Sequence, residues 1–268
     1  MADLGYKDGG NVKYEYRAAE AAGPELDEMA AELVRLKVDV IVAILTPTVV
    51  AARHATSTIP IVWMGADLPA SGIANLSRPE GNVTGALSPS ATLAGKALQL
   101  FHEIKPDAKL FGLLLNNADP FHIPLQRDVE VVAKAEKIEL IVELPNSHTE
   151  IANVMDALIK RGVGGAMIQP SLGLAVAARE ALARKLPAIS FRREFAEEGG
   201  LLSYATDYAD LTRVLARQTD KLLKGVPPGN IPVEQSTRFE MVVNRKTAST
   251  LGLALSPTFL ARADEVIE

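Results

Sequence analysis

The sequence DVIVAILTPTVVAARHAT, residues 39–56, contains the clearest structural signal in the chain. Residues 40–45 are apolar or small without polar alternation, which is typical of a strand buried on both faces of a parallel sheet. Thr46 and Pro47 then match the cap and the first turn of a helix. The stretch therefore predicts a strand that leads directly into a helix. The first N–H groups and the positive dipole end of that helix form a place to hold a carboxylate.

The same strand–turn–helix pattern recurs at residues 82–90, 110–120 and 165–171, and each turn has a hydroxyl or carboxamide beside a proline. Taken singly, these turns are ordinary helix caps; together they predict a ring of polar helix N-termini around one cleft. Strands that alternate with helices of ~10–15 residues predict an α/β protein with parallel sheets. Alternation over residues 12–17 predicts a further strand, and residues 257–267 are expected to be helical.

Composition excludes several classes of protein. The 268-residue chain has 48% hydrophobic and 23% charged residues, a net charge of −5 and no cysteine. It therefore lacks the excess of basic residues that a nucleic-acid binder needs, and no apolar run is long enough for direct membrane insertion. Without cysteine there are no disulfides, thiolate metal sites or Cys nucleophile. The first residues do not resemble a signal peptide, which leaves a cytoplasmic location open.

Motifs for catalysis and for cofactors are absent from the sequence. No glycine-rich nucleotide loop, nucleophile elbow or His-Glu-x-x-His motif is present, and the four histidines are far apart. We therefore expect no catalytic residues, no metal and no cofactor, and a protein that is not an enzyme.

Four segments together resemble a known family. They are residues 30–42, residues 57–62 with 77–85, residues 195–204, and residues 239–248. The chain is similar over nearly its whole length to ABC-transporter substrate-binding proteins of the tryptophan/tyrosine-uptake type. This resemblance implies a type I periplasmic-binding fold, in which two doubly wound parallel-sheet (Rossmann-like) domains trap a small ligand in the cleft between them by hinge closure. On that template domain 1 comprises residues 1–85 and 203–232, and domain 2 comprises residues 86–202 and 233–268.

The resemblance also implies a function. The chain would be the solute-binding component of an ABC importer, would capture a small amino-acid-like ligand in the periplasm, with an aromatic or branched amino acid as the default, and would deliver it to permease and ATPase subunits. Two alternatives stay open. One is a cytosolic ligand-sensing domain of the same fold, and the other is an α/β enzyme acting on a small acid, with Asp119, Asp207 and the histidines as its candidate residues.

Binding roles follow from the chemistry of the turns and strand ends. Hydroxyls are expected to bind a ligand carboxylate, Asp207 either to bind an ammonium group or only to cap the next helix, and two aromatic residues either to stack on the ligand or to pack in the core. Asn116 and Ser171 are expected contacts from domain 2, and Arg192 or Arg193 could pair an acid. The predicted ligand-binding residues are Thr46, Thr48, Trp63, Ser88, Ser90, Asn116, Ser171, Phe191 and Asp207.

The sequence departs from the family at its start. The resemblance implies a strand and a full helix before the equivalent of Gly5-Tyr6, so we expect this sequence to lack the first strand of domain 1. That strand is central in a doubly wound sheet. We therefore expect either a rearranged domain 1 or a homodimer whose partner chain compensates for the missing strand.

Overall fold

The computed structural model describes residues 1–19, 22–66, 68–79 and 81–268. The chain forms two compact units, which are described separately. Unit 1 comprises Met1–Ala19, Gly23–Ser88 and Asp207–Thr237, and unit 2 comprises Glu20–Ala22, Pro89–Thr206 and Arg238–Glu268. The main passages of the chain from one unit to the other follow Ser88, Thr206 and Thr237, each a few residues beyond the point that the family template implies.

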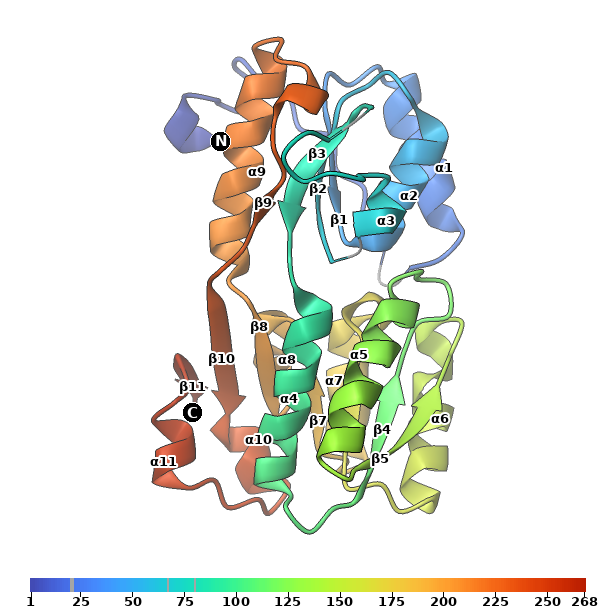
Figure 1. Ribbon diagram of the computed structural model, residues 1–268, viewed down its shortest axis with the longest axis vertical. Coiled ribbons are helices and arrows are strands. Elements are labelled where there is room, and N and C mark those ends of the chain that lie inside the picture. The colour runs from blue at the N-terminus through green and yellow to red at the C-terminus, as the bar shows by residue number, and fades with distance from the viewer. Residues whose placement is uncertain (20–21, 67, 80) are drawn as a thin grey trace. The chain divides into compact units, whose positions relative to one another are not determined.

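Unit 1 is built on a four-stranded parallel sheet with the strand order β1-β2-β3-β9. These strands are β1 (Ile41–Ile44), β2 (Ile61–Gly65), β3 (Val83–Leu87) and β9 (Glu234–Gln235). The helices of this unit are α1 (Glu25–Arg35), α2 (Thr46–Ala55), α3 (Leu68–Ser71) and α9 (Tyr208–Leu223), with short 3-10 turns at Ala2–Leu4 and Pro228–Asn230. Figure 1 shows α9 on one side of this sheet and α1 and α2 on the other.

The two faces of this sheet are covered unequally. On one face Ile41 and Ala43 pack under α2 in a cluster that includes Trp63. On the other face α9 packs its apolar residues against β2 and β3. This cover does not extend fully over β1, because Val42 is 49% exposed and Ile44 is 42% exposed. In the described part of the chain β1 pairs with β2 alone, so its other edge is the outer edge of the sheet.

The prediction of a strand at residues 12–17 is wrong, because these residues join neither sheet. A strand is stable only when a neighbour bonds its backbone groups, and here side chains hold the segment instead. Tyr6 donates its hydroxyl proton to Asp220 of α9 at 2.9 Å. Arg17 binds the carboxylate of Glu32 on α1 with two nitrogens, at 2.7 and 2.8 Å. The segment therefore follows the surface of unit 1 between two helices.

Helix α2 begins one residue earlier than the sequence predicts. Thr46 is its first residue, so Leu45 and not Thr46 is the N-cap. The N–H of Leu45 still donates to the carbonyl of Met64 at 2.7 Å, which extends the pairing of β1 with β2 up to the first residue of the helix. The whole turn is consequently made at Leu45, whose φ of 75° lies in the left-handed region that non-glycine residues rarely adopt.

Unit 2 is built on a seven-stranded sheet with the order β11-β10-β8-β7-β6-β4-β5. Only the pairing of β10 with β8 is antiparallel. The strands are β4 (Leu110–Leu114), β5 (Glu139–Glu143), β6 (Ala166–Ile168), β7 (Ala188–Ser190), β8 (Leu202–Thr206), β10 (Phe239–Asn244) and β11 (Glu265–Ile267). The helices are α4 (Ser90–Ile104), α5 (His122–Ala135), α6 (Ile151–Lys160), α7 (Leu174–Ala183), α8 (Arg193–Glu197), α10 (Arg245–Thr250) and α11 (Pro257–Leu260), with 3-10 turns at His148–Glu150 and Pro170–Leu172.

Helices cover both faces of the central strands of unit 2. In Figure 1, α4 and α5 lie in front of the sheet, whereas α6, α7 and α8 supply residues to a cluster on its other face. That cluster includes the strand residues Leu114 and Ile168. All three residues of β6 are buried, as the apolar run in the sequence predicts for a strand covered on both faces.

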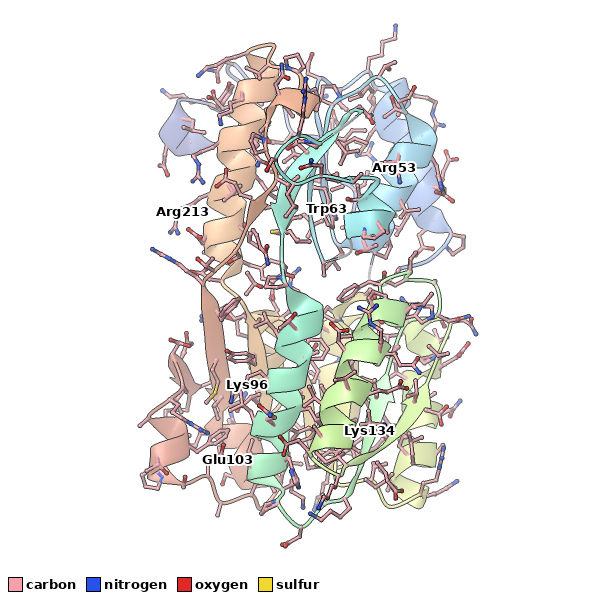
Figure 2. The ribbon with its side chains drawn as sticks, viewed as in Figure 1. Arg53, Trp63, Lys96, Glu103, Lys134 and Arg213 are labelled. Carbon is pink, nitrogen blue, oxygen red and sulfur yellow. The ribbon has the colours of Figure 1, made fainter. Side chains whose placement is uncertain are left out.

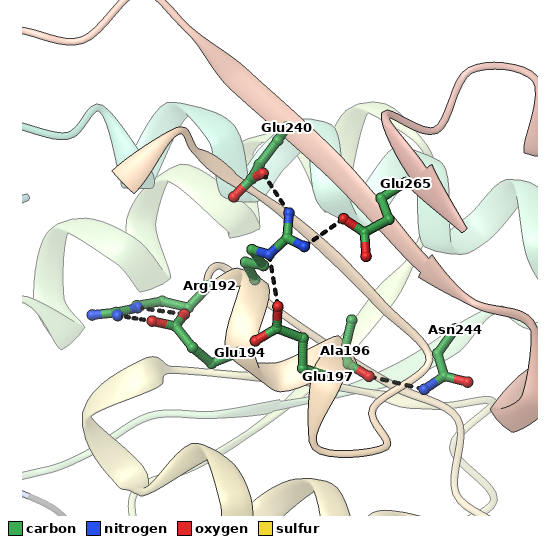
Figure 3. A network of polar contacts seen from close by, with 8 residues as sticks. Arg192, Glu194, Ala196, Glu197, Glu240, Asn244 and Glu265 are labelled. Carbon is green, nitrogen blue, oxygen red and sulfur yellow. Dashed lines mark hydrogen bonds and ion pairs between the residues drawn. The ribbon is translucent and has the colours of Figure 1, made fainter. Parts of the chain in front are cut away.

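The chain ends in a strand that a charge cluster ties to the sheet. The guanidinium of Arg193 on α8 pairs with Glu197 on the same helix, Glu240 on β10 and Glu265 on β11 (Figure 3). The expected helix at residues 257–267 is therefore only partly right. Its first residues form α11, whereas Glu265–Ile267 form β11 because β10 offers them a free parallel edge.

Candidate functional site

The turn after β1 carries two of the predicted binding residues. Thr46 is buried at the start of α2, whose first N–H groups have no partner inside the helix. The hydroxyl of Thr48 is directed back to the strand, with its Oγ1 at 2.7 Å from the carbonyl oxygen of Ile44 and 2.9 Å from that of Leu45. Its only proton is therefore engaged in holding the turn, and the oxygen keeps only acceptor capacity for a ligand.

Two more predicted residues follow β3. Ser88 is buried, and its backbone N–H donates to the carbonyl of Gly65 at the end of β2, at 2.7 Å. Ser90 opens helix α4, and its side chain lies outside the described part of the structure. Because β1, β2 and β3 are parallel, the turns that contain Thr46, Gly65 and Ser88 lie at the same edge of the sheet of unit 1.

The two predicted aromatic residues are both in hydrophobic interiors. Trp63 on β2 is fully buried in the cluster under α2, and Figure 2 shows it inside unit 1. Its indole Nε1 has no hydrogen-bond partner among the described residues. A Cβ on Gly65 would lie 2.4 Å from that nitrogen, so only glycine leaves room for the ring. Phe191, which follows β7, is also buried, in unit 2.

Asp207 is the N-cap of α9. Its Oδ1 accepts the backbone N–H of Asp210 at 3.1 Å, which is the capping interaction that the sequence offered as one alternative. The other carboxylate oxygen remains able to accept hydrogen bonds. The observed cap accounts for an aspartate at this position, and it is compatible with a second role in binding.

Unit 2 brings its two predicted residues into one buried polar cluster. Asn116 follows β4 and Ser171 follows β6, and the two strands are neighbours in the sheet. The side-chain Nδ2 of Asn116 donates to the carbonyl oxygen of Ser171 at 2.9 Å. The Oδ1 of Asn116 accepts the N–H of Ala118 at 2.9 Å. Asn116 therefore joins the two turns, and both of its polar side-chain atoms are engaged.

Two further residues complete this cluster. Asp119 is buried, and its Oδ2 accepts hydrogen bonds from Gln169 Nε2 at 2.7 Å and from Ser171 Oγ at 2.6 Å. Its Oδ1 accepts the N–H of Phe121 at 3.0 Å. The Oε1 of Gln169 in turn accepts the N–H of Asn116 at 2.9 Å. We call Asn116, Asp119, Gln169 and Ser171 the polar cluster of unit 2.

Only part of this cluster has a recognisable signal in the sequence. Asp119 stands in the turn after β4, but its relation to Ser171 depends on the pairing of β4 with β6, and the two residues are 52 positions apart. Gln169 is a polar residue directly after a fully apolar strand, which is the signal that would have singled it out.

Charged residues near Phe191 are paired within unit 2. Glu194 forms an ion pair with Arg192, and Arg193 pairs with three glutamates, so both arginines have acidic partners. Burial raises the pKa of the Glu194 carboxyl. The hydrogen bond from Arg192 and its positive charge together lower this pKa by more than burial raises it, so the pKa is below its ordinary value. The hydrogen bonds that Arg193 donates to Glu197 and Glu265 raise its pKa, so the guanidinium is charged at every physiological pH.

Among the described residues no three His, Asp or Glu side chains form a group that could hold a metal ion. Within the same residues, no helix combines the length and the apolar character that crossing a bilayer requires. The polar groups at the strand ends of each unit are thus hydroxyls, amides, carboxylates and backbone N–H groups. Such groups can bind the charged ends of a small polar molecule by hydrogen bonds.

Comparison with known proteins gives a consistent result. The sequence profile of the family described as ABC transporter substrate binding protein matches residues 1–267. The chain is 27% identical over 261 residues to a "Tyrosine-binding protein" of Clostridioides difficile, covering 94% of this chain and 74% of that protein. It resembles the crystal structure of a conserved domain protein from Vibrio cholerae, with a TM-score of 0.88 and 25% identity over 99% of this chain and 90% of that chain. An ABC domain in complex with L-Trp, from Streptococcus pneumonia, has the same fold, with a TM-score of 0.85 and 24% identity over 99% of this chain and 91% of that chain.

Proposed function

The chain belongs to the family of ABC transporter substrate-binding proteins, and on that premise we propose that it captures a free aromatic amino acid, such as tyrosine or tryptophan, for import. Family membership makes the chain a binding component and not an enzyme. The observation that carries the proposal is the match of the family profile to residues 1–267, which include both units. The choice of ligand is supported by the tyrosine-binding relative.

The proposal assigns ligand contacts to residues of both units, with capture by hinge closure as in other proteins of this fold. Hydroxyls and backbone N–H groups at the helix starts near Thr46, Ser88 and Ser90 would bind the carboxylate, supported by the favourable interaction of anions with helix N-termini. Asp207 would bind the ammonium group. The remaining assignments are Thr48, Asn116 and Ser171 as polar contacts. The burial of Trp63 and Phe191 in their units favours the alternative role in the core for these two residues.

A thermal-shift screen against amino acids and small carboxylates tests this function. A ligand at ~100 times its dissociation constant adds roughly 2.7 kcal/mol to the free energy of unfolding. In a chain of this length each kcal/mol raises Tm by about 2–4 °C. We expect clear shifts with L-tyrosine or L-tryptophan and none with glycine. A protein that melts cooperatively and shifts with no amino acid would refute the proposed ligand class.

A pair of variants separates the two roles of Asp207. Asparagine is as good a helix cap as aspartate, whereas alanine costs about 1 kcal/mol of stability at an N-cap. We therefore expect Asp207→Asn to retain its Tm and to bind amino acids more weakly, since it keeps the cap and loses the charge. Asp207→Ala should lose both stability and affinity. Unchanged affinity in Asp207→Asn would restrict this residue to capping.

The partners and location of the protein form a further part of the proposal. We propose that it acts in the periplasm and delivers its ligand to a permease and an ATPase, because these subunits complete an ABC importer.

We also propose that a second copy of the chain covers the outer edge of β1, supported by the exposed side chains of Val42 and Ile44. Sedimentation of the wild-type chain and of Ile44→Lys tests this. We expect a dimer that the lysine disrupts, and a wild-type monomer at micromolar concentration would refute this proposal.

A further inference from the structure

The polar cluster of unit 2 contains a carboxylate in a position that the proposed function has not used. Asp119 is 3% exposed, and three hydrogen bonds from Phe121 N–H, Gln169 Nε2 and Ser171 Oγ reach its two oxygens. Burying a carboxylate is costly unless hydrogen bonds compensate for lost water. This carboxylate is therefore part of a built arrangement, and it connects the turn after β4 with the turn after β6.

The hydrogen bonds of the cluster have a defined direction. An ionised carboxylate can only accept, so the hydroxyl of Ser171 must donate its one proton to Asp119. The orientation of Gln169 follows in the same way. Its Oε1 accepts the backbone N–H of Asn116, so its Nε2 is the atom that donates to Asp119. If the donor and the acceptor of any one of these hydrogen bonds were exchanged, another hydrogen bond of the cluster would be lost.

This direction determines what Ser171 offers to a ligand. Because its proton is committed to Asp119, the Oγ of Ser171 has only lone pairs left, and it is an obligate acceptor. A hydrogen bond to a negative group also polarises the hydroxyl and makes its oxygen a stronger acceptor. The chemical group that such an oxygen recognises is a donor with positive charge, and in an amino acid that group is the protonated α-amino group.

We propose that Asp119 is a positioning residue for ligand binding, which orients Ser171 Oγ as an acceptor for the protonated α-amino group of the bound amino acid. This inference rests on the proposed function, since it names the group of the ligand that unit 2 recognises. It adds a recognition element to the one suggested for Asp207 in unit 1, because an ammonium group has three N–H donors and can use more than one acceptor.

The variant Asp119→Asn removes the negative charge of the cluster with little change in shape. An amide oxygen in place of Oδ2 would keep the hydrogen bonds from Gln169 Nε2 and Ser171 Oγ, and the amide nitrogen would then face the N–H of Phe121. Ser171 would donate to a neutral oxygen, which polarises its hydroxyl less and makes its Oγ a weaker acceptor. Ser171→Ala removes the acceptor altogether and leaves Asp119 in place.

Calorimetric titration with two probes tests the inference. The probes are L-tryptophan and indolepropionate, which lacks the α-amino group and is otherwise the same molecule. We expect Ser171→Ala to weaken the binding of L-tryptophan by roughly 10- to 100-fold, the range expected for a hydrogen bond to a charged group. Asp119→Asn should weaken it by a smaller factor, because the acceptor remains and only its polarising charge is lost. Binding of indolepropionate should change by less than about threefold. Equal losses for both probes would mean a merely structural role and would overturn the inference.

A matched control is available in the same unit. Asp156 on α6 pairs with Arg184, with its Oδ1 at 2.7 Å from Nε, and Asp156→Asn makes the same chemical change outside the polar cluster. This variant should bind both probes as the wild-type protein does. If Asp119→Asn fails to melt cooperatively, Ser171→Ala still decides the question, because its discrimination between the probes depends on the acceptor alone.

Hydrogen exchange in the absence of ligand separates the two proposals. Asp119→Asn should lower the protection of the amide of Phe121, because this N–H loses its carboxylate acceptor, and Asp156→Asn should not. Unchanged protection in Asp119→Asn would overturn its positioning role. A wild-type chain that binds neither probe would refute the proposed function and the assignment of the α-amino group to Ser171. The hydrogen-exchange result would then decide by itself whether Asp119 positions the two turns.

Discussion

The two sheets of this protein have similar sequence patterns but different environments. Residues 40–45 and residues 165–168 are both uninterrupted apolar or small runs. In unit 2 the second run forms β6, which has neighbours on both edges and is buried throughout. In unit 1 the first run forms β1, which is an outer strand with Val42 and Ile44 half exposed. An apolar run therefore predicts a strand reliably in this chain, but the cover on its faces depends on elements far away in the sequence.

The strand ends of the two units also differ. In unit 1 the predicted residues Thr48 and Asp207 bond to backbone atoms close in sequence, those of Ile44 and Asp210. In unit 2 one carboxylate joins turns that are about 50 residues apart, through Gln169 and Ser171. Side chains thus tie two turns of unit 2 to each other, whereas in unit 1 a backbone hydrogen bond from Ser88 to Gly65 joins the turns after β3 and β2.

The largest expected difference between the units concerns two strand glycines. A Cβ on Gly85 in β3 would lie 1.9 Å from the backbone carbonyl oxygen of Trp63 on the neighbouring strand. A Cβ on Gly112 in β4 would lie 2.7 Å from the end of the flexible Leu158 side chain. Overpacking costs typically ~1–3 kcal/mol. We expect Gly85→Ala to reach or exceed the upper value and Gly112→Ala to stay near the lower one, as measured by urea unfolding. The reverse order would contradict the packing described here.

A matched pair of isoleucines measures the difference in cover directly. Ile168 on β6 is fully buried, and its change to alanine should lower the free energy of unfolding by about 2–5 kcal/mol. Ile44 on β1 is 42% exposed in the single chain, and we expect a loss of less than about 1 kcal/mol from Ile44→Ala at concentrations where the chain is a monomer. Urea midpoints of the two variants under these conditions would check this. A loss at Ile44 of the monomer as large as that at Ile168 would contradict the exposure of β1 described here.

The smallest expected effect is a pH dependence that differs between the units. The folded-state pKa of Glu194 is below its ordinary value, so its pair with Arg192 contributes stability above about pH 4.3, the unfolded pKa, and loses it as the pH falls through the folded pKa. We expect Glu194→Gln to be less stable than wild type at pH 7, by under about 1 kcal/mol.

The direction in which this stability difference changes with pH tests the pairing of Glu194 with Arg192. The difference between wild type and Glu194→Gln should shrink as unfolding is repeated between pH 5 and about pH 3. In unit 1 the hydrogen bond from Arg17 lowers the pKa of Glu32, but that pair lies on the surface, where solvent screens it. Glu32→Gln should therefore show a smaller change over the same pH range. A gap that widens on acidification would contradict the assigned pairing of Glu194.

Local patterns predicted most of the fold. The strand and helix at residues 39–56 form as expected, because an apolar run followed by a cap signal is sufficient information for both. The pattern failed at residues 12–17, where alternation was present but no strand lay alongside, and at 265–267, where a free edge of β10 took up residues expected to be helical. In both places the outcome depended on a partner strand that local sequence does not describe.

For the candidate site, too, the sequence predicted the local turns but not the contacts between them. The turns themselves could be found from hydroxyl and amide residues beside prolines, and the structure places Thr46 and Ser171 in such turns. The bonds of Asp119 with Gln169 and Ser171 could not be found, because they follow from β4 and β6 being neighbours in the sheet. Likewise the burial of Trp63 and Phe191 depends on the packing of helices against the strand that each belongs to or follows.

The central claim is that this chain binds an aromatic amino acid, and a calorimetric titration of the wild-type protein with L-tryptophan and L-tyrosine tests it most directly. We expect saturable binding of at least one of them, with one site per chain and a negative heat-capacity change from burial of the aromatic side group. A cooperatively folded chain that gives no saturable binding with either amino acid would contradict it.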